Sequence, residues 1–202
     1  HPNVGGFAWR RNPRTLMPPS VVTGSGVLIH PRVVLTAGHG TYLVENLIAG
    51  GSFTIDDLLV SFASDASDQD TWRPISSILT HPEFAAKQNI PNGGGAVPVA
   101  DVGVAILTEP VREISPMPLP PLGFLDDLRA AGKLRRSDQP KITLVGYGLE
   151  LDAEFPPDGL RRVAQAEFQN LHDRWLTLDK NISHDNGGGG NGDSGGPVLF
   201  VD

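Results

Sequence analysis

Short apolar runs, broken by glycine and proline, alternate with polar stretches along the whole chain. Runs this short, rich in valine, leucine and isoleucine, predict β-strands joined by turns rather than long helices. The 24 glycines and 18 prolines among 202 residues supply the turns, and no internal repeat of fixed period is present. The predicted strands cover residues 21–22, 27–29, 33–36, 53–62, 72–79, 102–107, 142–145, 160–166, 175–178 and 198–201.

Between these runs the sequence predicts loops and little helix. Residues 1–19 are basic and irregular, residues 41–48 form one helical turn or a loop, and residues 124–134 form a short helix. Residues 90–98 are a loop rich in glycine and proline. Five prolines within residues 109–123 make that stretch stiff and extended, as expected of an interdomain linker.

The composition restricts the class of protein. Apolar residues make up 39% and charged residues 19%, which is typical of a soluble globular chain. The net charge of −7, without a basic block, argues against nucleic acid or an anionic membrane as a partner. No apolar run approaches the ~20 residues of a membrane span. The absence of cysteine excludes cysteine catalysis and thiolate metal sites, but it does not fix the compartment.

The most distinctive stretch is residues 191–198, where Ser194 stands between glycines and directly follows Asp193. Glycines permit backbone angles and close approaches that a Cβ would obstruct. Such a turn can aim two backbone N–H groups at one point, as an oxyanion requires. A lone serine is a weak nucleophile, so this interpretation needs a base elsewhere in the chain.

His39 and Asp101 are the candidates for the base and for the group that orients it. His39 follows an apolar strand and the residues Thr-Ala-Gly, and Asp101 opens the apolar run 102–107. The other five histidines lie next to prolines in turns, at the terminus or in polar loops (His30, His81, His1, His172 and His184). A strand-end position favours His39, because functional residues concentrate on loops that follow strands.

Ser194 also satisfies the G-x-S-x-G pattern of the α/β-hydrolase elbow. That elbow requires a helix directly after the serine, with the acid and the histidine later in the chain. Here Pro197 and an apolar run follow, and none of the remaining residues is histidine. The acid and the base must therefore come from upstream.

In the order His39, Asp101, Ser194, the three motifs resemble those of the trypsin/chymotrypsin-like serine protease family. The family signatures are Thr-Ala-Ala-His, Asp-Ile-Ala-Leu-Leu and Gly-Asp-Ser-Gly-Gly-Pro. The serine motif matches without a change, whereas Gly38 replaces the second alanine and Gly40 stands where many members carry cysteine. The chain thus resembles a cysteine-free member of the microbial type.

Two shorter segments carry the resemblance further. Residues 81–84, His-Pro-Glu-Phe, are similar to a landmark that many members place between the His and Asp motifs, so His81 is expected to be structural. Residues 146–148, Gly-Tyr-Gly, are similar to the family's Gly-Trp-Gly.

The resemblance implies an all-β fold of two antiparallel Greek-key β-barrels of the chymotrypsin type. The first barrel is expected over residues 1–109 with the His and Asp motifs, and residues 110–123 are expected to be the linker. Residues 124–202 are expected to form the second barrel with the serine motif. Members of the family continue for several tens of residues beyond the serine, so a C-terminal fragment or a second chain is expected to complete this barrel.

The resemblance also implies a secreted, extracellular serine endopeptidase that acts on protein or peptide substrates through an acyl-enzyme. Ser194 is the expected nucleophile, His39 the general base, and Asp101 the group that orients the imidazole. The N–H groups of Gly192 and Ser194 are expected to bind the oxyanion, and Asp193 to hold the turn. Neither a cofactor nor a metal ion is expected.

Two features have alternative interpretations. Val4-Gly5-Gly6 resembles the start of activated members, whose terminal ammonium pairs with the acid before the serine; an ordinary glycine turn is the alternative. Three acids within residues 64–70 resemble a calcium loop, which some relatives have there. The stretch lacks the glycine and the terminal glutamate of an EF-hand, so a solvated loop is favoured.

The specificity and the activity also leave alternatives open. The position six residues before the serine, which is the floor of the specificity pocket in the family, is Gly188, and the nearest acid is Asp185. This argues against a strict preference for arginine or lysine. Two other functions are an inactive or truncated protease homologue that acts as a binding module, and a serine esterase of the same fold.

Overall fold

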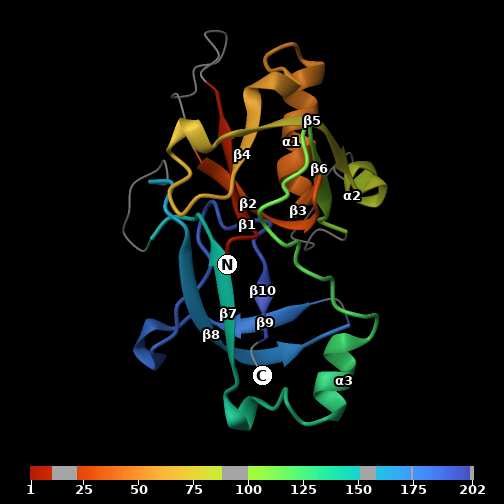
Figure 1. Cartoon of the computed structure of the whole chain (residues 1–202). Coiled ribbons are helices and arrows are strands. Elements are labelled where there is room, and N and C mark those ends of the chain that lie inside the picture. The colour runs from red at the N-terminus through yellow and green to blue at the C-terminus, as the bar shows by residue number, and fades with distance from the viewer. Residues whose placement is uncertain (11–21, 88–99, 151–157, 174, 201–202) are drawn as a thin grey trace.

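The structure is a computed structural model that describes residues 1–10, 22–87, 100–150, 158–173 and 175–200. The predicted loop at 90–98 lies outside the described residues. The chain is mostly β with few helices. Figure 1 shows a barrel in the upper half, a separate sheet in the lower half and an extended segment that joins them.

Six antiparallel strands close into the barrel in the order β1-β2-β3-β6-β5-β4. The strands are β1 (Val4–Trp9), β2 (Val22–His30), β3 (Val33–Thr36), β4 (Leu58–Ser61), β5 (Arg73–Thr80) and β6 (Gly103–Leu107). Strand β1 pairs with both β2 and β4 and so closes the barrel. Closure leaves no unpaired edge, and the apolar side chains turn inward to form the core.

Strand β1 corrects the prediction that residues 1–19 are irregular. All six residues of β1 are buried. A Cβ on Gly5 would lie 2.8 Å from Val60, and a Cβ on Gly6 would lie 2.9 Å from the ring of Tyr147. These two glycines look like a turn in the sequence, but here they allow close packing against neighbouring side chains.

A three-turn helix, α1 (Gly38–Ala49), replaces the single turn or loop that was predicted near residues 41–48. Thr41 and Val44 are buried, and Leu47 and Ile48 pack against the barrel core. The N-cap residue is Ala37, whose side chain makes no capping hydrogen bond. The usual polar start signal of a helix is therefore missing from the sequence.

The other helices are short. They are α2 (Pro82–Lys87), α3 (Phe124–Ala130) and the 3-10 turns Ile55–Asp57, Gln69–Thr71, Arg136–Asp138 and Ile182–His184. Helix α3 confirms the prediction of a helix beginning at residue 124. Within the described residues, no helix has the length and apolarity to cross a membrane.

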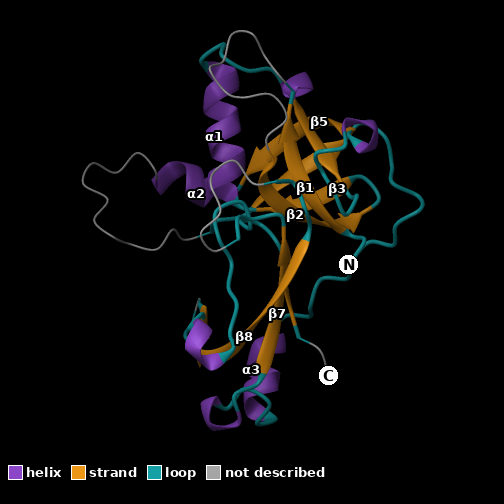
Figure 2. Cartoon of the chain, turned by 90° about the vertical axis from the view of Figure 1, so that its left-hand side faces the viewer, coloured by secondary structure: helices purple, strands orange, loops and turns teal. Residues whose placement is uncertain are grey.

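The second half is a four-stranded antiparallel sheet in the order β10-β7-β8-β9. Its strands are β7 (Lys141–Gly146), β8 (Arg162–Leu171), β9 (Leu176–Asp179) and β10 (Val198–Leu199). The described residues do not close this sheet, so a second barrel is not formed by them. Figure 2 shows the long strands β7 and β8 extending away from the barrel.

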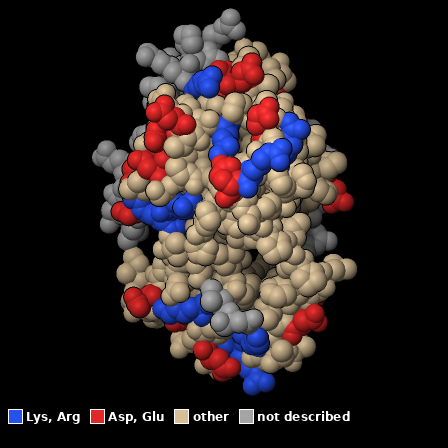
Figure 3. Space-filling view, in the orientation of Figure 1, with Lys and Arg blue, Asp and Glu red and all other residues tan. Residues whose placement is uncertain are grey.

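The proline-rich segment between the two halves runs along the barrel. Val111 donates its N–H to Pro31 O (2.7 Å), and Met117 donates to Leu28 O (2.8 Å). The surface in Figure 3 shows acidic and basic side chains interspersed over the barrel and the sheet.

Candidate active site

The serine turn of the second half packs against the barrel beside the start of α1. Ser25 on β2 donates its N–H to Ser194 O (2.9 Å). A Cβ on Gly195 would lie 2.3 Å from Thr36 Oγ1 and 2.7 Å from Ala37 N. Gly195 also has φ +85°, which favours glycine. The glycine therefore lets Ser194 lie against the segment that leads into His39.

His39 is the second residue of α1, and Asp101 holds it through two contacts. The His39 N–H donates to Asp101 Oδ1 (2.6 Å), and His39 Nδ1 lies 2.9 Å from Asp101 Oδ2. A carboxylate can only accept a hydrogen bond, so the proton of a neutral imidazole belongs on Nδ1. Nε2 is then the free acceptor, as a general base requires.

A tight turn presents Asp101 to the helix. Ala100 has φ 58°, and Val102 N–H donates to Ala100 O (2.7 Å). Non-glycine residues seldom adopt this conformation, and strained residues of this kind tend to cluster at functional sites. A Cβ on residue 38 would lie 2.8 Å from Val102 N. The absence of a side chain on Gly38 is thus what lets this turn approach α1.

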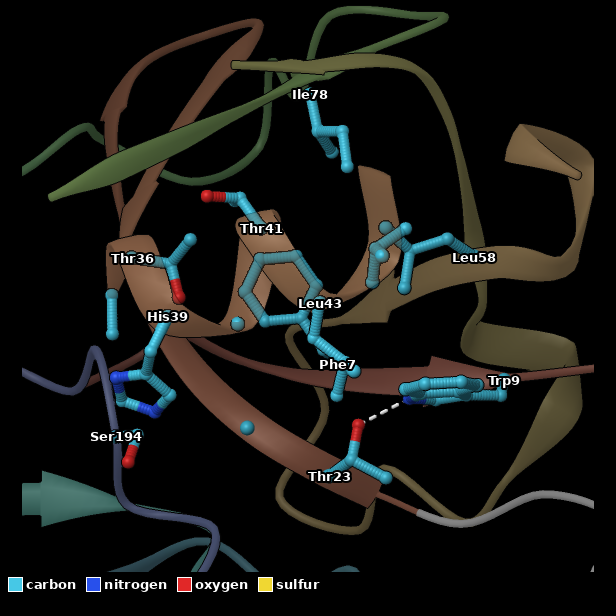
Figure 4. Close-up of a pocket in the computed structure, with 14 residues that line it drawn as sticks. Phe7, Trp9, Thr23, Thr36, His39, Thr41, Leu43, Leu58, Ile78 and Ser194 are labelled. Atoms are coloured by element: carbon cyan, nitrogen blue, oxygen red, sulfur yellow. Dashed lines mark hydrogen bonds between the residues drawn. The ribbon is translucent and has the colours of Figure 1, made fainter. Parts of the chain in front are cut away.

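The structure brings the three predicted residues together from three distant parts of the chain. His39 and Ser194 line the same cavity, and Figure 4 shows both side chains at the same end of it. The His39 side chain is 51% exposed and that of Asp101 26% exposed. The acid is thus partly shielded, and the imidazole stays accessible to a substrate.

Two backbone N–H groups of the turn have their directions fixed by the carbonyls of their own peptide units. Asn191 O accepts from Leu149 N (2.8 Å), and Asp193 O accepts from Gly196 N (2.9 Å). In a planar trans peptide the N–H points opposite to the carbonyl. The N–H groups of Gly192 and Ser194 therefore point away from these partners. No group among the described residues accepts from either one.

Asp193 binds backbone amides on both sides of the turn. Its Oδ1 accepts from Gly148 N and its Oδ2 from Gly190 N, each at 2.8 Å. A Cβ on Gly146 or Gly148 would lie within 2.3 Å of this carboxylate. The Gly-Tyr-Gly segment thus makes room for the acid, and the acid braces the turn.

The interpretation of Val4-Gly5-Gly6 as an ordinary glycine turn is wrong for this structure. Val4 begins strand β1, is fully buried, and donates its amide N–H to His1 O (3.2 Å). It is therefore part of a strand rather than of a turn, and its backbone N–H is bonded to His1 O rather than to Asp193. The backbone amides described above are the partners of the acid instead.

Ser25 is the important residue that the sequence analysis missed. Its side chain is fully buried. The hydroxyl donates to Gly192 O (2.8 Å) and accepts from Tyr147 N (2.9 Å). Thr36 Oγ1 in turn donates to Ser25 O (2.8 Å). The sequence signal is a serine between two glycines directly before an apolar run, which alone does not distinguish it from a strand residue.

Tyr147 joins the two halves beneath the turn. It is fully buried, and its hydroxyl donates to Ala63 O (2.6 Å). Arg161 Nη1 contributes a hydrogen bond to the Tyr147 hydroxyl (3.3 Å) and one to Phe62 O (3.0 Å). Burial raises the pKa of the phenol, against a lowering effect of the Arg161 charge. Tyr147 therefore acts as a neutral donor.

The predicted pocket floor carries no acid. Gly188 packs against the stem of Lys180, whose Nζ donates to Gly189 O (3.0 Å). The Asp185 side chain is fully exposed, 3.9 Å from Lys141 Nζ. A cavity of about 510 Å³ lies between this glycine loop and strands β7 and β8.

The acidic loop at residues 64–70 uses its carboxylates locally. Asp65 Oδ1 accepts from the backbone N–H and the hydroxyl of Ser67, and Asp68 Oδ1 accepts from Asp70 N. In the described part of the chain, no group of three or more His, Asp or Glu side chains could hold a metal ion.

No protein-family model matches the chain, and no curated protein matches it. The resemblance to serine proteases therefore depends on the three motifs and on their arrangement.

Proposed function

We propose that the chain is a serine endopeptidase of the chymotrypsin type, with Ser194 as nucleophile, His39 as general base and Asp101 as the orienting acid. The observation that carries the proposal is the double contact of Asp101 with His39, which lines the same cavity as Ser194. Among the described residues, the N–H groups of Gly192 and Ser194 in the serine turn have no acceptor. A histidine without a catalytic role would not require a carboxylate bonded to both its backbone N–H and its ring nitrogen.

The reaction follows from these positions. His39 Nε2 takes the proton of the Ser194 hydroxyl as Oγ bonds to the peptide carbonyl carbon. The N–H groups of Gly192 and Ser194 bind the oxyanion, and each such donor is typically worth roughly 100- to 1000-fold in rate. His39 then protonates the leaving nitrogen as the C–N bond breaks. Water, deprotonated by His39, hydrolyses the acyl-enzyme.

A fluorophosphonate tests the nucleophile directly. Ser194 Oγ should displace fluoride and retain the phosphonyl group, which peptide mapping by mass spectrometry would place on residue 194. Ser194→Ala should abolish the adduct, and His39→Ala should slow its formation strongly. Folded wild-type protein that takes no label would contradict the proposal.

Paired substrates distinguish the two other functions. A serine esterase of the same fold would hydrolyse activated esters but not peptides. An inactive homologue that acts as a binding module would hydrolyse neither and would not be labelled.

We further propose that the four-stranded sheet is part of a second barrel, which a C-terminal fragment or a second chain completes. The support is the open sheet with apolar side chains exposed on it, including Val163 (57%) and Val198 (44%). Native mass spectrometry of the protein from its source should show a companion polypeptide. A chain that is active and stable alone would contradict this.

A further inference from the structure

An apolar cavity of about 130 Å³ opens beside Ser194 and extends into the barrel. Apolar side chains from β1, α1, β4 and β5 form most of its walls: Phe7, Trp9, Leu43, Val44, Leu58 and Ile78. Figure 4 shows His39 and Ser194 at one end and Trp9 and Leu58 at the other. We propose that this cavity binds an apolar side chain of the substrate residue directly after the cleaved bond. The inference rests on the proposed function, and it concerns the part of the site that binds the leaving group.

The side of the cavity relative to the scissile bond follows from the chemistry. His39 delivers its proton to the leaving nitrogen, so the leaving group lies on the imidazole side of Ser194. The cavity is lined by His39 and other residues of α1, and among the described residues only Ser194 comes from the second half of the chain. The substrate residues before the cleaved bond lie on the side of the glycine turn. The cavity is therefore available to the residue after the cleaved bond.

The threonine hydroxyls and the indole N–H of the cavity wall are already paired within the protein. The Trp9 indole N–H donates to the hydroxyl of Thr23, as Figure 4 shows. Thr36 Oγ1 donates to Ser25 O, and Thr41 Oγ1 donates to Gly38 O. The threonines therefore leave mainly their methyl groups for a ligand. A polar substrate side chain would lose its water without gaining these partners.

The size of the cavity fits one branched or aromatic side chain. An apolar cavity of about 150 Å³ lined by Leu, Ile and Phe stays dry and takes up benzene. Two glycines keep the space open next to the reacting groups. A Cβ on Gly40 would meet nothing within 4 Å, and one on Gly24 only Ser194 O at 3.8 Å and Phe7 at 4.0 Å. Larger residues at these positions can therefore fill the cavity without disturbing the backbone.

Acyl transfer to added amines tests the leaving-group side alone. The acyl-enzyme is formed from a panel of nitrophenyl esters and is then partitioned between water and leucinamide, phenylalaninamide, glycinamide or aspartic acid α-amide. Leucinamide or phenylalaninamide should capture the acyl group at least about tenfold better than glycinamide, since a single methylene in an apolar pocket already gives roughly 10- to 200-fold. Aspartic acid α-amide should be the poorest.

Filling variants connect this preference to the cavity. Gly40→Leu and Gly24→Val should each reduce the ratio of leucinamide to glycinamide capture below about threefold. The ratio is taken within one variant, so a general loss of rate cancels. Ala49→Leu, on an exposed position of the same helix outside the cavity, should keep the wild-type ratio.

Each outcome decides the matter. If wild-type protein forms an acyl-enzyme but captures all four amides within about twofold, the cavity is not a subsite, while the proposed function stands. An unchanged ratio in both filling variants also overturns the inference. If no ester acylates the protein and the fluorophosphonate does not label it, the proposed function and the subsite are both wrong.

Discussion

Replacing Ser25 by alanine tests whether one buried hydroxyl positions the serine turn. The change removes the donor to Gly192 O and the acceptor of Tyr147 N. Each buried backbone group left without its partner costs about 1–3 kcal/mol, so the free energy of unfolding should fall by between about 2 and 6 kcal/mol. Against a typical stability of about 5–15 kcal/mol, the variant should remain folded at low temperature.

The same change should slow the chemistry. The N–H groups of Gly192 and Ser194 remain, but the carbonyl of Gly192 is no longer held. Phosphonylation should slow by about 10- to 100-fold, less than the roughly 100- to 1000-fold loss when an oxyanion donor is removed. The assay is the second-order rate constant of labelling, with the unfolding midpoint measured on the same samples.

Ser61→Ala is the matched control. Ser61 is also fully buried in the barrel, where its hydroxyl contacts Thr71 Oγ1 (2.6 Å) and accepts from Ala63 N (3.1 Å). It should lose similar stability and keep the wild-type labelling rate. If Ser25→Ala labels at the wild-type rate, or if both variants slow equally, the positioning role of Ser25 is refuted.

Three more variants test other contacts. Asp101→Asn should lower kcat by about four orders of magnitude with little change in KM, because an amide facing the His39 N–H groups favours the wrong tautomer; a small effect on steady-state rates would contradict this. Tyr147→Phe should lower the free energy of unfolding by about 1–3 kcal/mol in urea titrations, and an unchanged midpoint would contradict the buried hydrogen bonds. The bidentate hydrogen bonds from Arg162 lower the pKa of the Asp158 carboxyl to about 2. This ion pair therefore stabilises the folded state fully above the unfolded pKa of about 3.9, and the stabilisation is lost as the pH falls through about 2. Urea midpoints of Asp158→Asn should therefore lie below those of the wild type at pH 7 and converge with them near pH 2; a difference that stays constant with pH would contradict this.

The sequence predicts well those elements whose signal is local. Strands β3 and β6 are short apolar runs, and their positions and the helix that begins at residue 124 agree with the predictions. His39 and Asp101, which are in contact, each lie close to the end of a strand, β3 and β6 respectively. These strands fix the position of the backbone that carries each side chain. Their arrangement agrees with the site that the motifs predict, and their catalytic roles stay a prediction.

The failures come from features that only the folded chain supplies. Gly5 and Gly6 indicate a turn until Val60 and Tyr147 are known to lie against them. Helix α1 has no polar residue at its N-cap, and the carboxylate that accepts the His39 N–H in its first turn comes from Asp101, far along the chain. Ser25 is an ordinary strand serine in the sequence, since its two partners are more than 100 residues away along the chain, at separations of 167 and 122.

Strand β1 belongs to both halves of the molecule at once. It seals the barrel through β2 and β4, and it is also the seat of Tyr147, which rests on Gly6 and is hydrogen-bonded to Val4 O (3.1 Å). Tyr147 in turn reaches the serine turn through Ser25. Substitutions in strand β1 should therefore disturb the packing of Tyr147 and, through the Ser25 hydroxyl, the position of the turn that carries Ser194.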